Sequence, residues 1–251
     1  MTTNPYAAPK AAVADETVVI NSDYIPGGQS RPAGHGWSWI SASWDLFKRQ
    51  PGMWIGMWLL FVIIMIGAGI LPFLGTILTA LFWPVFVAGF AVGCRALDEG
   101  GEMEIAHLFA GFRERLGPLV GVGALSLLAS LIIGMVVGLG LGAGAFTMMR
   151  GDPETMAALA GTTMALLVLI TMALLLPVMM AAWFAPALVV FQGEGVIDSM
   201  KGSFAGCLKN IVPFLVYGVV FFLLALGWLV LGPMISASVY TSYRDIYLKP
   251  R

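Results

Sequence analysis

The sequence predicts an all-α, polytopic membrane protein: a bundle of six transmembrane helices arranged as three hairpins, each preceded by an amphipathic helix at the cytoplasmic surface. Three observations lead to this prediction. Of the 251 residues, 59% are hydrophobic and 11% are charged, whereas a soluble domain carries roughly 25% charged residues. Four long intervals contain no Asp, Glu, Lys, Arg or His. A short motif of aromatic and basic residues also occurs three times.

The apolar intervals predict membrane-embedded helices. They are continuously apolar and lack the in-out alternation of outer-membrane strands. A helical crossing needs about 20 apolar residues, so the first interval is long enough for two crossings, with a turn at residues 71–75. Polar residues 150–154 separate the next two crossings. The predicted crossings are residues 53–71, 76–96, 118–144 and 160–184, with one or two more within residues 211–247.

The basic residues favour two crossings in the last interval. With six crossings and both termini in the cytoplasm, Arg150 is the only one of the 13 Lys and Arg residues outside. With five crossings, Arg244, Lys249 and Arg251 would also lie outside, against the positive-inside rule. The sequence therefore predicts a multi-pass protein of the bacterial inner membrane with both termini cytoplasmic.

The first 36 residues differ from the rest. They are rich in Pro, Ala and Gly, and they lack the basic start and apolar run of a signal peptide. We expect residues 1–36 to form a disordered cytoplasmic tail and residues 37–251 to form a single transmembrane domain.

A recurring motif precedes the odd-numbered crossings. Its copies begin at Ile40, Ile105 and Met200, and each stands just before a predicted crossing. Aligned without gaps from these residues, the copies read ISASWDLFKRQ, IAHLFAGFRER and MKGSFAGCLKN.

Matching prolines occur in the even-numbered crossings. Pro84, Pro177 and Pro233 are each followed four residues later by alanine, and Arg95 and Arg244 both lie eleven residues after their proline. We interpret the prolines as sites of helix packing with a shared kink; helix breaks at a transport site are the alternative. Because both ends of the pattern recur in the same order, the sequence predicts three structural units, at about residues 37–98, 102–191 and 196–248.

Each motif copy carries an apolar stripe with helical spacing. In the second copy the stripe includes Ile105, Phe109 and Phe112, with charged residues outside it. Such a helix either lies on the membrane, with its aromatic residues at headgroup depth and its basic residues near anionic lipid, or caps the cytoplasmic end of the bundle. The candidate contacts with lipid or a partner are Trp37, Trp44, Phe47, Lys48, Arg49, Phe109, Phe112, Arg113, Arg115, Phe204 and Lys209.

Three glycines of the third predicted crossing have GxxxG spacing. Gly134, Gly138 and Gly142 would let another helix approach closely, and close packing drives helix association in lipid. We therefore predict helix packing at these residues.

The sequence offers little chemistry. Apart from residues at the cytoplasmic ends, such as Arg95, no Asp, Glu, Lys, Arg or His lies within a predicted crossing, which disfavours an ion-coupled transporter. No acid, base, nucleophile or metal-ligand constellation can be assembled from it. We expect no enzyme activity, cofactor, metal or nucleic-acid partner, and we expect membrane lipids as partners, with a membrane protein or a second copy of the chain as a further possibility.

Several segments also resemble a known family. They are the NPYAAP start, W-x-x-F-K-R-Q-P at residues 44–51, FAGCLKNIVPFLVYG at residues 204–218 and ASVYTSYRDIY at residues 237–247. These segments resemble a betaproteobacterial family of six-pass inner-membrane proteins of unknown function. More distantly, the alternation of aromatic amphipathic helices and hairpins resembles YciC-like proteins and the membrane domain beside some glycerophosphodiester phosphodiesterases. The resemblance implies no catalytic residue.

These observations lead to a prediction of function. We expect an integral inner-membrane protein that is not an enzyme and that organises lipid or partner proteins at the cytoplasmic face. The alternative is a transporter or facilitator of a small or lipid-like solute.

Overall fold

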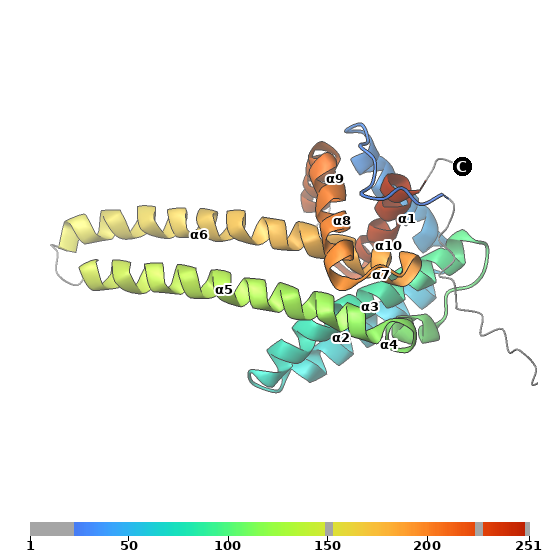
Figure 1. Ribbon diagram of the computed structural model, residues 1–251, viewed down its shortest axis with the longest axis horizontal. Helices are drawn as coiled ribbons and strands as arrows, with labels where there is room; N and C mark the ends of the chain where they lie inside the picture. The colour runs from blue at the N-terminus through green and yellow to red at the C-terminus, as the bar shows by residue number, and fades with distance from the viewer. Residues whose placement is uncertain (1–22, 149–152, 224–227, 249–251) are drawn as a thin grey trace, which may run out of the picture.

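The computed structural model describes residues 23–148, 153–223 and 228–248, and nearly all of these are helical (Figure 1). Within this part of the chain the β-structure amounts to one isolated antiparallel bridge, between Tyr24 and Leu248. The helices are α1 (His35–Arg49), α2 (Pro51–Gly69), α3 (Leu74–Asp98), the 3₁₀ helix η1 (Ile105–Phe109), α4 (Ala110–Glu114), α5 (Leu116–Met148), α6 (Pro153–Trp183), α7 (Ala185–Gln192), α8 (Val196–Lys209), α9 (Ile211–Leu223) and α10 (Trp228–Tyr247).

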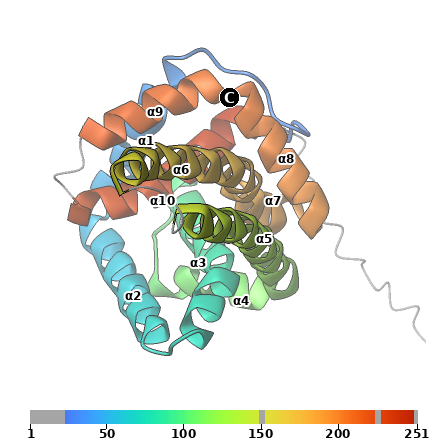
Figure 2. The same ribbon diagram turned by 90° about the vertical axis from the view of Figure 1, so that its left-hand side faces the viewer.

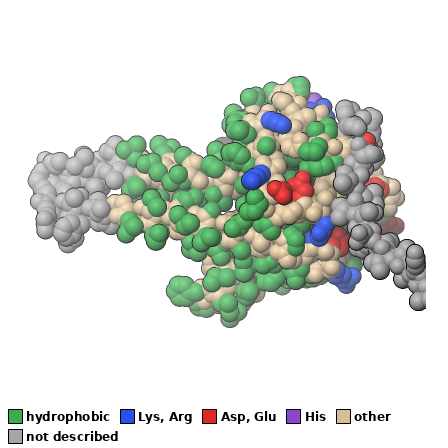
Figure 3. All heavy atoms as spheres, viewed as in Figure 1, with side chains coloured by type: hydrophobic (Ala, Val, Ile, Leu, Met, Phe, Trp, Pro, Cys, Tyr) green, Lys and Arg blue, Asp and Glu red, His purple; other side chains and the backbone are tan. Residues whose placement is uncertain are grey.

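Helices α5 and α6 form a long hairpin that projects from the other helices (Figure 1). They contain 33 and 31 residues, which corresponds to about 50 and 46 Å at 1.5 Å per residue. Many of their described apolar side chains, such as Leu139 and Leu169, are exposed. Hydrophobic side chains cover this hairpin, whereas the charged side chains in view lie over the opposite end of the molecule (Figure 3). We call that opposite end the head.

Four helices are long and apolar enough to cross a membrane: α2, α3, α5 and α6. The pair α8 and α9, which is bent by 79°, would be a fifth candidate. Figure 2 shows α5 and α6 end-on but α9 and α10 lengthwise, so the last two helices run across the long hairpin. The predicted six crossings are therefore not confirmed. Charge counting could not settle this point, because helices that return to the cytoplasmic side without crossing also keep their basic ends inside.

Each motif segment packs mainly on a hairpin that belongs to another predicted unit. Helix α1 contacts α9 and α10, η1 and α4 contact α3, and α8 contacts α6 and α7. The Ser203 hydroxyl of α8 donates to the Met180 carbonyl oxygen at 2.6 Å and accepts from the Phe184 N–H at 2.9 Å. The Thr241 hydroxyl of α10 donates to the Trp39 carbonyl oxygen of α1 at 3.2 Å. These contacts follow one another around the head and form a closed circle (Figure 2).

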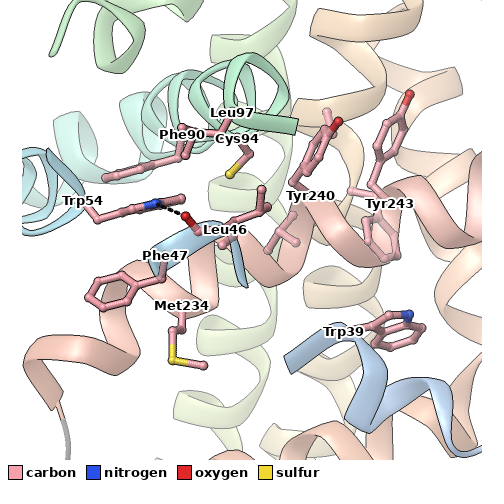
Figure 4. Close-up of a cluster of buried hydrophobic side chains, with 14 of the residues drawn as sticks. Trp39, Leu46, Phe47, Trp54, Phe90, Cys94, Leu97, Met234, Tyr240 and Tyr243 are labelled. Atoms are coloured by element: carbon pink, nitrogen blue, oxygen red, sulfur yellow. Dashed lines mark hydrogen bonds between the residues drawn. The ribbon is translucent and has the colours of Figure 1, made fainter. Parts of the chain in front are cut away.

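An aromatic core joins α1, α2, α3 and α10 within the head (Figure 4). Trp54 is fully buried, donates its indole N–H to the Leu46 carbonyl oxygen at 3.3 Å, and stacks on Phe90 with ring centroids 6.3 Å apart. Aromatic pairs of this kind add about 0.5–1.5 kcal/mol beyond the burial of their area. Tight packing of this kind fixes the start of the α2–α3 hairpin to the head.

The second motif copy is not one continuous amphipathic helix, so the prediction was wrong in that respect. It divides into η1 and α4 at Phe109, whose φ of −100° and ψ of 6° depart from the helical values. Glu104 and His107 form a capping box that starts η1, and Leu108 is the fully buried residue of the segment. The stripe spacing was helical, but the cap and the short turn divided it.

Residues 23–34, which were expected in the disordered tail, are folded against the head. The Gln29 N–H donates to the Ile246 carbonyl oxygen at 2.8 Å, and Arg31 forms an ion pair with Asp245 at 3.0 Å. Tyr24 pairs with Leu248. Composition suggested disorder because the segment has few apolar residues; its order instead comes from polar contacts with the end of α10. Residues 1–22 lie outside the described residues.

Gly134 and Gly138, two of the three predicted packing glycines, do not lie at contacts with other described residues. A Cβ added at Gly134 or Gly138 would meet nothing within 4 Å, and the surroundings of Gly142 lie outside the described side chains. Close packing of α5 occurs instead at Gly123, where an added Cβ would lie 2.6 Å from the carbonyl oxygens of Ala80 and Leu81 in α3. Packing at the GxxxG face therefore stays a prediction, and within the described residues it would need a helix from another chain.

The predicted prolines are placed unequally. Pro84 of α3 and Pro233 of α10 are buried within helices of the head, as the packing interpretation requires. Pro177 of α6 is exposed on the long hairpin, so this proline has no packing role within the chain.

Candidate functional site

Helix α8 presents its apolar stripe outward. Its buried residues are small or polar: Ser199, Ser203, Gly206 and Cys207. An added Cβ at Gly206 would clash with the hydroxyl of Tyr247 in α10, so the small residue is what allows α10 to approach. A neighbouring face carries the stripe, in which Ile197 and Leu208 are each 52% exposed and Met200 and Phe204 are half-buried. Asp198, Lys201 and Lys209 are also exposed on α8.

The stripe continues along α9 with four exposed residues. They follow the 79° bend between α8 and α9 and are Ile211, Val212, Leu215 and Val219.

Fully buried Asn210 lies at this bend and satisfies its polar groups. Its side-chain amide donates to the carbonyl oxygens of Gly206 and Gln29, both at 2.9 Å, and accepts from the Arg31 N–H at 2.8 Å. We call the exposed apolar residues of α8 and α9 the α8–α9 stripe.

The predicted stripe of α1 divides between two faces. Ile40 and Phe47 are buried in the head, together with Trp39, which the sequence analysis did not single out. Trp37 and Trp44 face outward and are 57% and 41% exposed. Which tryptophan is buried depends on the partner helices α9 and α10, and spacing within α1 could not reveal that.

The aromatic rings of the second motif copy pack on α3. Phe112 lies 5.3 Å from Phe86 and 5.6 Å from Phe82 between ring centroids, and Phe109 lies 6.2 Å from Phe86. These rings pack on α3, so for this copy the capping alternative fits better than contact with lipid.

The predicted basic contacts have two different environments. Lys209 donates to the carbonyl oxygens of Gly27 and Gly28 at 2.9 and 2.8 Å, and Arg49 donates to that of Leu97, so these two cations hold the head together. Lys48 pairs with Asp45 at 2.9 Å on the exposed side of α1. Arg113 is exposed and Arg115 is half-buried. Neither side chain has a hydrogen bond or ion pair with the described residues.

A polar crevice lies where the ends of α3, α7 and α10 meet, and the sequence analysis did not predict it. It has a volume of about 30 Å³ and includes Arg95, Asp98, Gln192 and Arg244 in its lining. Arg95 pairs with Glu99 at 2.8 Å, and Arg244 pairs with Asp98.

The two crevice arginines are the ones that lie eleven residues after Pro84 and Pro233. This recurrence was the one feature of the sequence analysis that could have pointed to the crevice. Each lies in the last turn of its helix, where a positive charge complements the helix dipole. Because each is also matched by a carboxylate, the crevice carries balanced charge.

Tyr24 fixes the N-terminal segment beside this crevice. Its hydroxyl donates to a carboxylate oxygen of Glu194. Burial, together with this carboxylate, raises the pKa of Tyr24 well above its ordinary value, so the hydroxyl stays protonated and continues to donate.

Other chemistry is sparse in the described residues. Among them there is no cluster of three or more His, Cys, Asp or Glu side chains that could hold a metal ion. Cys94 and Cys207 are free and buried.

Comparison with known proteins found no matching family model and no matching solved structure. A protein of Burkholderia thailandensis named "Probable inner membrane protein" is 30% identical over 200 residues, which cover 76% of this chain and 74% of the relative. The more distant resemblances to YciC-like proteins and to phosphodiesterase membrane domains stay predictions. At this identity and coverage, the chain belongs to the same family as that inner-membrane protein.

Proposed function

We propose that the protein is a non-enzymatic inner-membrane protein that holds membrane lipid against the cytoplasmic side of its head. The observation that carries this proposal is the orientation of α8, which buries its small polar face and leaves its apolar stripe exposed. A helix at the surface of a soluble protein does the reverse. The stripe needs an apolar surrounding, and at the base of a membrane hairpin lipid supplies one.

The size of the stripe makes an aqueous surrounding unfavourable. Burying one large aliphatic side chain contributes about 1.5–3 kcal/mol. Six such side chains are exposed along α8 and α9: Ile197, Leu208, Ile211, Val212, Leu215 and Val219. Contact with acyl chains would recover most of this free energy.

The ends of the described chain support a cytoplasmic head. Tyr24 and Leu248 pair with each other, so both ends lie on the same side of any membrane. This favours an even number of complete crossings. Basic residues collect on the head, and the positive-inside rule assigns that side to the cytoplasm. The circular packing of motif segments on neighbouring hairpins supports the three predicted units.

The stripe can be tested by counting bound lipids. We expect the variant with Ile197→Ser and Leu208→Ser to retain fewer phospholipids per protein than the wild type in native mass spectrometry after mild detergent extraction. Asp198→Ser is the matched control, because Asp198 is also exposed on α8 but lies outside the stripe. An unchanged lipid count, with loss of a co-purified protein in its place, would show that the stripe binds a protein partner.

Anionic lipid can be tested separately. Arg113 and Arg115 are unpaired with the described residues, so changing both to Gln should lower the anionic share of the retained lipid. Lys209→Gln is the control, because Lys209 holds the backbone of Gly27 and Gly28; we expect it to weaken the head without changing lipid preference. Equal anionic enrichment in all three proteins would rule out the two arginines as headgroup contacts. The transporter alternative stays a prediction that needs a transport assay.

A further inference from the structure

The turn between α2 and α3 is entirely apolar. Residues 69–75 read GILPFLG, with no charged or hydrogen-bonding side chain. The turn is also outward-facing: Ile70 is 74% exposed and Phe73 is 88% exposed. By contrast, the link between α5 and α6 contains RGDPE at residues 150–154, as expected for a link that reaches water.

Apart from the Phe73 N–H, which has no partner among the described residues, the N–H groups of this turn are satisfied without water. The N–H groups of Ile70, Leu71, Leu74 and Gly75 all donate to carbonyl oxygens within the hairpin, at 2.6–3.2 Å. An added Cβ at Gly75 would clash with the carbonyl group of Ala68, so the two helices are in contact directly at the turn. A turn inside hydrocarbon must satisfy its polar backbone groups in this way.

One residue directs the turn outward. Phe73 has a φ of 58°, and it is the only described non-glycine residue with a positive φ. This conformation is unfavourable for a bulky residue. Phe73 adopts this unfavourable conformation at the apex of the hairpin. It is also the most exposed large hydrophobic residue among the described residues.

The turn is far from the end of the long hairpin. Helices α3 and α5 contact each other where Gly123 meets Ala80 and Leu81. Beyond this point α5 continues for 25 residues to Met148, or about 38 Å. Helix α3 continues for only seven residues from Leu81 to its start at Leu74, or about 10 Å.

These lengths determine the depth of the turn when α5 crosses the bilayer. Helix α5 begins directly after Arg113 and Arg115, and Gly123 is seven residues, or about 10 Å, beyond its start. The turn then lies at most about 20 Å into a hydrocarbon core of about 30 Å. Because α2 and α3 are tilted relative to α5 and α6, the true depth is smaller (Figure 2).

We propose that α2 and α3 form a re-entrant hairpin that enters from the cytoplasmic side and ends within the membrane, with Ile70 and Phe73 in contact with lipid acyl chains. Both helices are long enough to cross, but they are tilted relative to α5 and α6 (Figure 2). This inference concerns a different surface from the α8–α9 stripe and does not depend on it.

Cysteine labelling tests the depth of the turn. Phe73→Cys and Ile70→Cys are made separately in the wild-type background, where Cys94 and Cys207 are buried. In spheroplasts we expect neither new thiol to react with a membrane-impermeant maleimide. A control thiol at Gly151→Cys, within the polar link, should react. Labelling of the turn from outside would overturn the proposal and restore a complete crossing.

Depth-dependent quenching identifies what covers the turn. The same two variants carry a bimane label and are reconstituted with lipids that bear a nitroxide on either the acyl chain or the headgroup. We expect stronger quenching by the acyl-chain nitroxide at both positions. Stronger quenching by the headgroup nitroxide would overturn the proposal. If neither lipid quenched the label, a second copy or another protein would cover the turn, and this result would also overturn the proposal.

Discussion

The hairpins α2–α3 and α5–α6 are built from similarly apolar sequences, yet the protein uses them differently. In the most apolar 18-residue stretch of α3, half of the residues are buried inside the protein, whereas none are in that of α6. The first hairpin is held by the aromatic core of the head, and the second projects beyond the other helices (Figure 1). Apolar composition therefore identifies membrane helices but does not tell whether protein or lipid surrounds them.

The largest expected difference between the hairpins concerns a buried and an exposed side chain. Trp54→Ala removes a fully buried ring that stacks on Phe90, and we expect it to lower the free energy of unfolding by about 3–5 kcal/mol. Leu169→Ala, on exposed α6, should change it by no more than about 0.5 kcal/mol. Thermal unfolding in one detergent measures both. Equal losses would mean that the two hairpins are packed alike.

A charge at the turn of α2–α3 should have the next largest effect. Phe73→Asp would place a carboxylate inside the hydrocarbon, at a cost of about 2.5–3.5 kcal/mol for insertion. We expect a lower yield of membrane-inserted protein, measured by carbonate extraction. Gly151→Asp, in the polar link, is the control and should leave the yield unchanged. A normal yield of Phe73→Asp would indicate that the turn lies in water.

The contact between the two hairpins can be tested by two matched glycine substitutions in α5. Gly123→Ala forces a Cβ against the carbonyl oxygens of Ala80 and Leu81, and we expect a loss of about 1–3 kcal/mol in stability. Gly138→Ala meets open space and should stabilise the helix by up to about 1 kcal/mol. Denaturation of both variants provides the comparison. Destabilisation by Gly138→Ala would mean that the GxxxG face binds a helix from another chain.

The smallest effect should come from a surface ion pair on the head. Asp45→Asn removes the exposed ion pair with Lys48, and we expect it to lower the free energy of unfolding by about 0–1 kcal/mol. Asp245→Asn is the half-buried counterpart, because Asp245 accepts from Arg31 and Trp39 and contacts His35. Loss of the Asp245 carboxylate should lower the free energy of unfolding more, by about 1–3 kcal/mol. Thermal unfolding distinguishes the two, and similar values would show that the N-terminal segment is not held by this carboxylate.

The helices could be predicted closely from the sequence because their limits are set by local chemistry. The turn at residues 71–75 was located from its Pro and Gly, and α5 and α6 were separated by polar residues 150–154. The last interval contains helices α9 and α10, but the two crossings that the basic residues suggested are not confirmed. Their direction across the long hairpin could not be predicted, because it depends on packing against α1 and α8.

The site was predicted less completely for a related reason. Spacing identified the stripe of α8 but not the side to which it turns, since that depends on Gly206 admitting Tyr247. Spacing also gave equal weight to Lys209 and Arg113, although only the first is bound to backbone carbonyl oxygens. The crevice between Arg95 and Arg244 needed three helix ends from different parts of the chain, and no local pattern contains that information.

The circular packing of the head has a consequence for biosynthesis. Helix α1 leaves the ribosome well before its partners α9 and α10. Until they arrive, the Trp39 indole lacks its acceptor on Asp245, and the Trp39 carbonyl lacks its donor on Thr241. A nascent chain therefore has to keep the inner face of α1 protected while the two hairpins enter the membrane, and the head is completed only after α10 has been made.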